Sequence, residues 1–261
     1  MAIMWSSSSF ISSHHQRLAL YGDFTMSKTN TQPGAPQTEL PALTTIKELF
    51  GSCRDCETTH DITSARKFER QVAALVAQIA ASAPNTADHA DALAYHEYTL
   101  LSLSRTSKRP LVSKSLRDAA YAQGAASVLI RLNADKPDIG TVFATYNLAI
   151  DLICTEKRSL EGLQWMLKAA ALLNRLAGKK KLPRNILDFK LYSLDYGIAQ
   201  AYYDMKEPKT ARTILKRALR HAPKLNTANW SELRGVAKCS ELLAQIYLDE
   251  KDAERAAKQA A

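Results

Sequence analysis

The sequence predicts an all-α protein, and its composition and residue spacing both support this. Only nine Gly and nine Pro occur among 261 residues, whereas turn-rich β folds depend on both. Beyond Pro41, apolar residues recur three or four positions apart, as on one face of a helix, and no stretch alternates with period two for long. We therefore expect about ten helices, arranged as antiparallel hairpins.

The first helices are predicted from Pro and Gly positions together with apolar spacing. A helix begins at Pro41, and Gly51 is expected to end it. The apolar residues between 68 and 79 lie on one face of a second helix that ends before Pro84. A third helix is expected at 87–105.

Capping patterns predict the following three helices. The segment Ser115–Asp118 has the form of a capping box, which would open a helix that runs to about Leu132. Asp138 and Ser159 are expected to cap the next two helices.

The second half of the chain follows a polar break at 178–184. Its apolar spacing predicts helices at about 185–204, 208–221, 228–249 and 252 to the end. Pro208 would occupy a first helical position, where its missing N–H is harmless. Helix pairs recur roughly every 40 to 50 residues, which is typical of a solenoid of hairpins.

The chain is expected to consist of a disordered segment, 1–40, and a helical domain, 41–261. The first segment is rich in Ser and other polar residues, which disfavour a packed core. Two interpretations of residues 1–25 remain open: an organelle-targeting segment, or an upstream start before Met26, which opens a polar stretch of its own.

Charge is concentrated in one segment. The formal net charge is +9. Residues 168–224 contain fourteen Lys or Arg against four Asp or Glu, so the rest of the chain is close to neutral. Four scattered Cys do not suggest a disulfide framework, and no stretch approaches the ~18 apolar residues of a membrane span. We expect a soluble, cytoplasmic protein that does not contact membranes, with organelle targeting as the alternative.

Residues 191–257 resemble a tetratricopeptide repeat (TPR). One copy matches the spacing of that repeat at Ile198, Ala199, Tyr202, Lys206, Ala211, Leu215, Ala218 and Pro223, and a second begins at Leu243, Ala244, Tyr247, Lys251 and Ala256. Small Ala residues would let two helices approach closely. The copies lie 45 residues apart, from Ala211 to Ala256, against ~34 in a standard repeat. The resemblance implies a right-handed solenoid of stacked hairpins.

The resemblance also implies a concave groove, lined by the first helix of each pair, that holds a partner peptide or helix. The positions carried over are Ser193, Tyr196, Gln200, Tyr203, Lys238, Glu241, Gln245 and Leu248. Repeats that clamp a chaperone's terminal carboxylate have Lys and Asn where this chain has Tyr196 and Gln200. The resemblance therefore favours a protein-binding scaffold and disfavours a receptor for chaperone tails.

A basic surface is the second candidate site. Lys209, Arg212, Lys216 and Arg220 are spaced 3, 4 and 4 and so form a line along one helix. The remaining members are Lys179, Lys180, Lys181, Arg184 and Arg217. Three interpretations remain open: a solvated outer face, a surface for an acidic protein partner, and a phosphate-facing surface for nucleic acid.

Other motifs carry weaker hypotheses. Cys53, Cys56 and His60 have partial zinc-ligand spacing but no second cluster, so we expect loop cysteines and no metal. Residues 115–132 faintly resemble a helix-turn-helix, with a close helix crossing at Gly124 as the alternative. Because no phosphate loop, nucleophile elbow or His-Glu-x-x-His motif occurs, we expect no enzyme and no cofactor. An enzyme on a helical scaffold stays the third hypothesis, after the protein-binding scaffold and the nucleic-acid-associated protein.

Overall fold

The computed structural model describes residues 40–178, 183–222 and 230–260, except for the side chains of 184, 230–232 and 252–260. By its internal contacts the chain divides into residues 1–39 and 40–261, and only the second unit is described here. The disorder predicted for residues 1–40 therefore lies outside the described residues, apart from Leu40.

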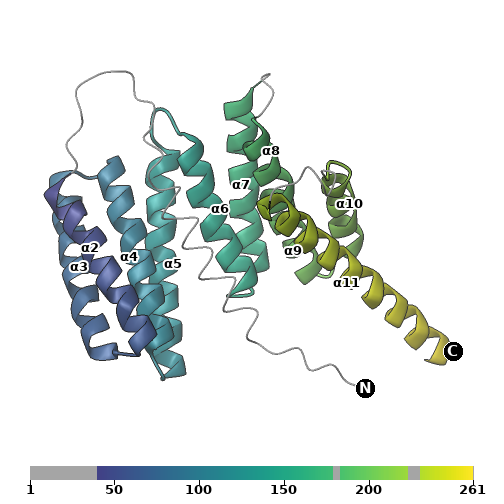
Figure 1. Ribbon diagram of the computed structural model, residues 1–261, viewed down its shortest axis with the longest axis horizontal. Coiled ribbons are helices and arrows are strands. Elements are labelled where there is room, and N and C mark those ends of the chain that lie inside the picture. Colours follow the sequence, from purple (N-terminus) through teal and green to yellow (C-terminus); the bar gives the residue numbers. More distant parts are fainter. Residues whose placement is uncertain (1–39, 179–182, 223–229, 261) are drawn as a thin grey trace. The chain divides into compact units, whose positions relative to one another are not determined.

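Throughout these ranges the protein is helical, without a strand, which confirms the predicted all-α class. The elements, shown in Figure 1, are α2 (Pro41–Thr59), α3 (Ile62–Ser82), α4 (Ala87–Thr106), α5 (Pro110–Leu132), α6 (Ile139–Cys154), α7 (Ser159–Ala177), α8 (Arg184–Phe189), the π-helical turn η1 (Lys190–Leu194), α9 (Asp195–Asp204), α10 (Pro208–Leu219) and α11 (Trp230–Ala260).

The expected number of about ten helices is corrected to nine continuous helices in the part of the chain that the structure describes. Elements α8, η1 and α9 follow one another without a break and count as one helix. The expected break near residue 250 is absent, because α11 continues to Ala260. No Gly or Pro occurs after Gly235, so no helix-breaking residue interrupts α11.

Two predicted helix ends are wrong for related reasons. Helix α2 continues through Gly51 to Thr59, and His60 ends it in a left-handed conformation. Helix α5 begins at Pro110 rather than at Ser115. One Gly inside a helix costs only ~1 kcal/mol, which packing of the surrounding residues outweighs, and Pro at a first position costs no hydrogen bond.

The two predicted caps have different outcomes. Asp138 caps α6 as expected, because its Oδ1 accepts a hydrogen bond from the backbone N–H of Thr141 at 2.9 Å. Ser159 is instead the first residue of α7, and its hydroxyl donates to Oδ2 of Asp204 at 3.1 Å. The side chain that was expected to cap one helix therefore links α7 to the end of α9.

Consecutive helices pack as hairpins, most extensively in the pairs α4/α5 and α6/α7, followed by α2/α3 and α9/α10. The largest apolar core joins residues of α4, α5, α6, α7, η1 and α9. A second core joins η1, α9, α10 and α11. Tyr196 and Tyr202 of α9 pack against both cores. Helix α9 therefore connects the larger core to the one that contains α10 and α11.

Candidate functional site on helices α9, α10 and α11

The predicted groove residues of the first helix lie on η1 and α9. Ser193 is in the π-helical turn, and Tyr196, Gln200 and Tyr203 follow on α9, all four partly buried. Since Tyr196, Gln200 and Tyr203 are spaced three or four residues apart on α9, these three share one helix face. That shared face agrees with the spacing in the sequence.

Hydrogen bonds hold the middle of this face in place. The hydroxyl of Tyr196 donates to Oε1 of Gln200 at 3.4 Å, and Nε2 of Gln200 donates to Oδ1 of Asp204 at 2.9 Å. The other oxygen of Asp204 accepts from the Ser159 hydroxyl of α7. This chain of hydrogen bonds from Tyr196 to Ser159 therefore restricts the rotamers of Tyr196 and Gln200.

Asp249 of α11 joins groove residues from two helices. Its Oδ2 accepts a hydrogen bond from the hydroxyl of Tyr203 on α9, and its Oδ1 accepts from Nε2 of Gln245 at 2.7 Å. The bond to Asp249 raises the pKa of Tyr203 to about 12, and the same bond lowers the pKa of Asp249. The structure thus brings together Tyr203 and Gln245, which lie 42 residues apart in the sequence.

Sequence reasoning missed Asp249. Its spacing of four residues from Gln245 was a signal, because side chains at i and i+4 of a helix are neighbours. Its bond to Tyr203 spans 46 residues and follows only from how α11 packs.

The other α11 groove positions differ in exposure. Lys238 is partly buried, Glu241 is exposed, and the side chain of Leu248 is 56% exposed. Tyr247, the residue before Leu248, is 42% exposed. An aliphatic and an aromatic side chain are therefore available on the surface of α11 beside the Asp249 junction.

Helix α11 lies close to the π-helical turn η1. A Cβ placed on Gly235 of α11 would lie 2.6 Å from Cβ of Tyr192 in η1, so the two backbones meet where α11 has no side chain. Leu191, Tyr192 and Leu194 of the turn are buried. The sequence predicted an ordinary helix here. A π-helical segment contains one extra residue in a helical turn, and this insertion has no apolar pattern of its own.

The predicted basic stripe is only partly a free surface. Nη1 of Arg212 lies 2.6 Å from Oε2 of Glu250 on α11. The guanidinium of Arg212 and Nζ of Lys216 lie 5.8 Å and 5.4 Å from the ring centroid of Tyr247. Arg212 and Lys216 therefore attach α10 to α11, in addition to any role toward a partner.

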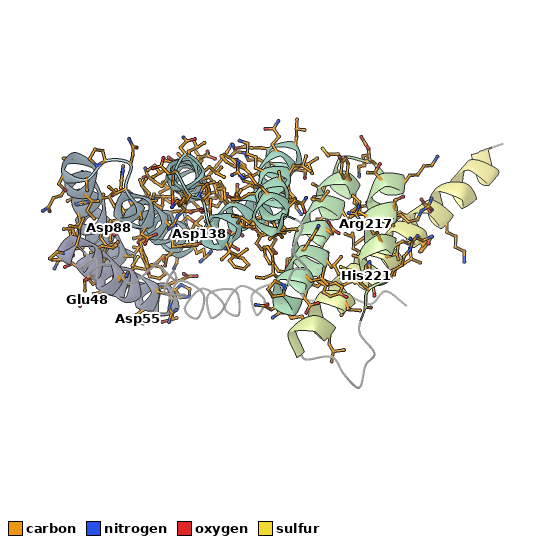
Figure 2. The ribbon with its side chains drawn as sticks, turned by 90° about the horizontal axis from the view of Figure 1, so that it is seen from above. Glu48, Asp55, Asp88, Asp138, Arg217 and His221 are labelled. Atoms are coloured by element: carbon orange, nitrogen blue, oxygen red, sulfur yellow. The ribbon has the colours of Figure 1, made fainter. Side chains whose placement is uncertain are left out.

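Arg217, labelled in Figure 2, also has an internal partner. Its Nη2 lies 3.2 Å from Oδ2 of Asp195, whose residue is 6% exposed. Burial raises the pKa of Asp195, and the positive charge of Arg217 opposes that rise. Arg217 therefore stabilises an otherwise unfavourable buried carboxylate.

Two residues of the stripe remain fully available. Lys209 and Arg220 are exposed, and neither forms an ion pair with any residue that the structure describes. Together with Lys216 they face away from buried Ala211 and Leu215. Lys179, Lys180, Lys181 and the side chain of Arg184 lie outside the described residues, so their place relative to this face stays a prediction.

The remaining motifs lie in helices of the described ranges. Cys53 and Cys56 are buried on α2 and are not loop cysteines, and burial raises the pKa of Cys53 to about 11. Over the same ranges, no three His, Cys, Asp or Glu are grouped so that they could hold a metal ion. Residues 115–132 lie within one uninterrupted helix, which contradicts the helix-turn-helix hypothesis.

Comparison with known proteins finds no matching family model and no significant match among curated proteins. None of the helices in the described ranges combines the length and apolar character of a bilayer-spanning segment.

Proposed function

We propose that the protein is a TPR-like, non-catalytic scaffold that binds a partner peptide or helix along α9 and α11. The observation that carries the proposal is the convergence of Tyr203 and Gln245 on Asp249. Two predicted groove positions on different helices thereby meet at one carboxylate, which supports a binding surface that includes both helices.

The composition of this surface favours a polypeptide partner. Exposed Tyr247 and Leu248 are the aromatic and aliphatic types that anchor protein interfaces. Tyr196, Gln200 and Tyr203 are already held by hydrogen bonds, so binding would cost less side-chain entropy than it would for free side chains.

Exposed α11 residues provide the test, because Tyr196 packs into both cores and its removal would also disturb the fold. We expect the double substitution Glu241→Ala and Leu248→Ala to lower the amount of retained polypeptide at least tenfold. The helical circular dichroism spectrum should stay unchanged. The measurement is quantitative mass spectrometry of proteins retained by the immobilised full-length chain.

The matched control is Glu48→Ala with Leu111→Ala, which removes an exposed carboxylate on α2 and a Leu side chain at a residue on α5 that is 84% exposed. It should leave the retained set unchanged. Equal retention by the control and by the α11 variant would contradict the proposed surface.

A second candidate function, association with nucleic acid, is favoured by the unpaired and exposed Lys209 and Arg220. We expect Lys209→Glu with Arg220→Glu to weaken binding of mixed DNA and RNA. The slope of log K against log salt should become smaller in magnitude by about two, because each phosphate contact contributes about 0.9. Arg212 is left unchanged, since its ion pair with Glu250 supports the fold.

The control for charge is Lys108→Glu with Arg109→Glu, which changes net charge equally at exposed positions before α5. A titration at low and moderate salt separates the outcomes. If both variants weaken binding equally, the effect is one of net charge, and the candidate function is wrong.

A further inference from the structure

Glu97 of α4 is a buried carboxyl group without a hydrogen-bonding partner. Its residue is 7% exposed, and among the residues that the structure describes none forms a hydrogen bond with it. Carboxyl groups at such positions are normally paired, because burial of an isolated charge is strongly unfavourable. The surroundings of Glu97 therefore determine which protonation state the fold accepts.

Gly124 of α5 provides the space that the carboxyl group occupies. A Cβ placed on Gly124 would lie 2.5 Å from Cδ, Oε1 and Oε2 of Glu97. All three atoms thus sit directly against the α5 backbone. On this side of the carboxyl group the α5 backbone therefore takes the place of water.

The charged groups near Glu97 do not neutralise it. Asp151 of α6 contributes a like charge, which adds to burial in raising the pKa of Glu97 well above its ordinary value. Arg117 of α5 is engaged elsewhere, with its Nε 2.7 Å from Oε1 of Glu156. The same Oε1 accepts a hydrogen bond from Tyr121, another buried α5 residue, at 3.4 Å.

The neighbouring ionisable residue on α4 is directed to another helix. Nε2 of His96 lies 3.2 Å from Oε1 of Glu69 on α3. No cation from α3, α4, α5 or α6 in the described residues is thus paired with Glu97.

We propose that Glu97 is a proton-dependent lock: its protonated carboxyl group completes the α4/α5 contact, and loss of the proton loosens the packing of α5 on α6. The position suits this role, because α5 and α6 pack far less extensively than the helices within the α4/α5 and α6/α7 hairpins on either side. A negative charge at Glu97 of α4 repels Asp151 of α6, and it favours the entry of water between α5 and α6.

The direction of the pH effect follows from proton linkage. The folded protein keeps the Glu97 proton at pH values where the unfolded chain, with an ordinary pKa of 4.5, has lost it. The stability contribution of Glu97 is therefore present at low pH. It is lost as the pH rises from about 4.5 toward the raised pKa that Glu97 has in the folded protein. Within that window the unfolding equilibrium constant increases about tenfold per pH unit.

The first test compares wild type with Glu97→Gln, which keeps the shape of the side chain but cannot ionise. Hydrogen exchange, corrected for intrinsic rates, should show that α5 and α6 of the wild type lose protection between pH 5 and pH 8.5. Over the same pH range Glu97→Gln should lose clearly less protection in α5 and α6 than the wild type loses. Glu48→Gln, which removes an exposed carboxyl on α2, should behave as wild type.

Burial also raises the pKa of Asp91 and Asp195, so the wild type has other pH-dependent contributions of the same sign. These contributions are the same in both proteins, so they cancel when the loss of protection in Glu97→Gln is subtracted from the loss in the wild type. An equal loss of α5 and α6 protection in both proteins would overturn the proposal.

A second measurement does not depend on the folding of Glu97→Gln. Infrared spectra of the wild type should contain a protonated-carboxyl band that persists well above pH 4.5 and disappears as α5 and α6 lose protection. Asp151→Asn removes the like charge, so the band should disappear at lower pH. Absence of the band at pH values above 4.5, or an unchanged midpoint in Asp151→Asn, would overturn the lock.

Discussion

Replacement of Gly162 with Ala is expected to lower the free energy of unfolding by about 1–3 kcal/mol. A Cβ at this position on α7 would lie 2.5 Å from Cγ1 of Ile153 and 2.8 Å from the backbone oxygen of Ala149, both on α6. The oxygen belongs to the α6 backbone and can move only if the helix moves. The new methyl group must therefore push α6 and α7 apart at this contact.

The matched control is Gly51→Ala on α2, where a new Cβ meets no atom within 4 Å. This substitution should stabilise the protein by about 0.5–1 kcal/mol, because Ala has the higher helix propensity. Urea unfolding of both variants, followed by circular dichroism, tests the opposite signs. A stabilising Gly162→Ala substitution would contradict the close α6/α7 contact.

Replacement of Leu215 with Ala should destabilise the protein by about 2–5 kcal/mol. Leu215 of α10 is completely buried and belongs to the core formed with η1, α9 and α11. Removal of its side chain leaves a cavity between α10 and its neighbours, and the surrounding helices relax only in part. The loss should appear in urea unfolding and as faster hydrogen exchange in α10 and α11.

Leu248→Ala is the control for this prediction, since the chemical change is identical and the side chain is 56% exposed. It should change the unfolding free energy by less than about 0.5 kcal/mol. If both Leu substitutions destabilised the protein equally, the assignment of Leu215 to the core and Leu248 to the surface would be wrong. The same control shows whether loss of partner binding in an α11 variant reflects the surface alone.

Much of the candidate site could be predicted from periodicity. The spacing of Tyr196, Gln200 and Tyr203 predicted one shared helix face, and all three lie on α9. The line of Lys209, Arg212, Lys216 and Arg220 was also predicted, but spacing could not separate side chains that bind α11 from those that face solvent. That distinction depends on Glu250 and Tyr247, which lie more than 25 residues further along the chain.

The sequence by itself determined the helical class and the start or end of several helices. These features depend on local chemistry: the fixed φ of Pro208, the side-chain acceptor of Asp138 and the apolar spacing of α3. Local signals failed at Gly51 and Ser115, where packing along a longer helix outweighed the cost of one unfavourable residue or the benefit of one cap.

Only the tertiary structure decided which distant polar groups meet. The carboxyl group of Glu97 lies against Gly124, and Asp249 accepts from both Tyr203 and Gln245. Such pairs have no characteristic spacing in the sequence, because they arise where two separately formed helices cross. The electrostatic environment of a carboxyl group depends on its burial and on its neighbours across these crossings, so its role becomes visible only after the helices are packed.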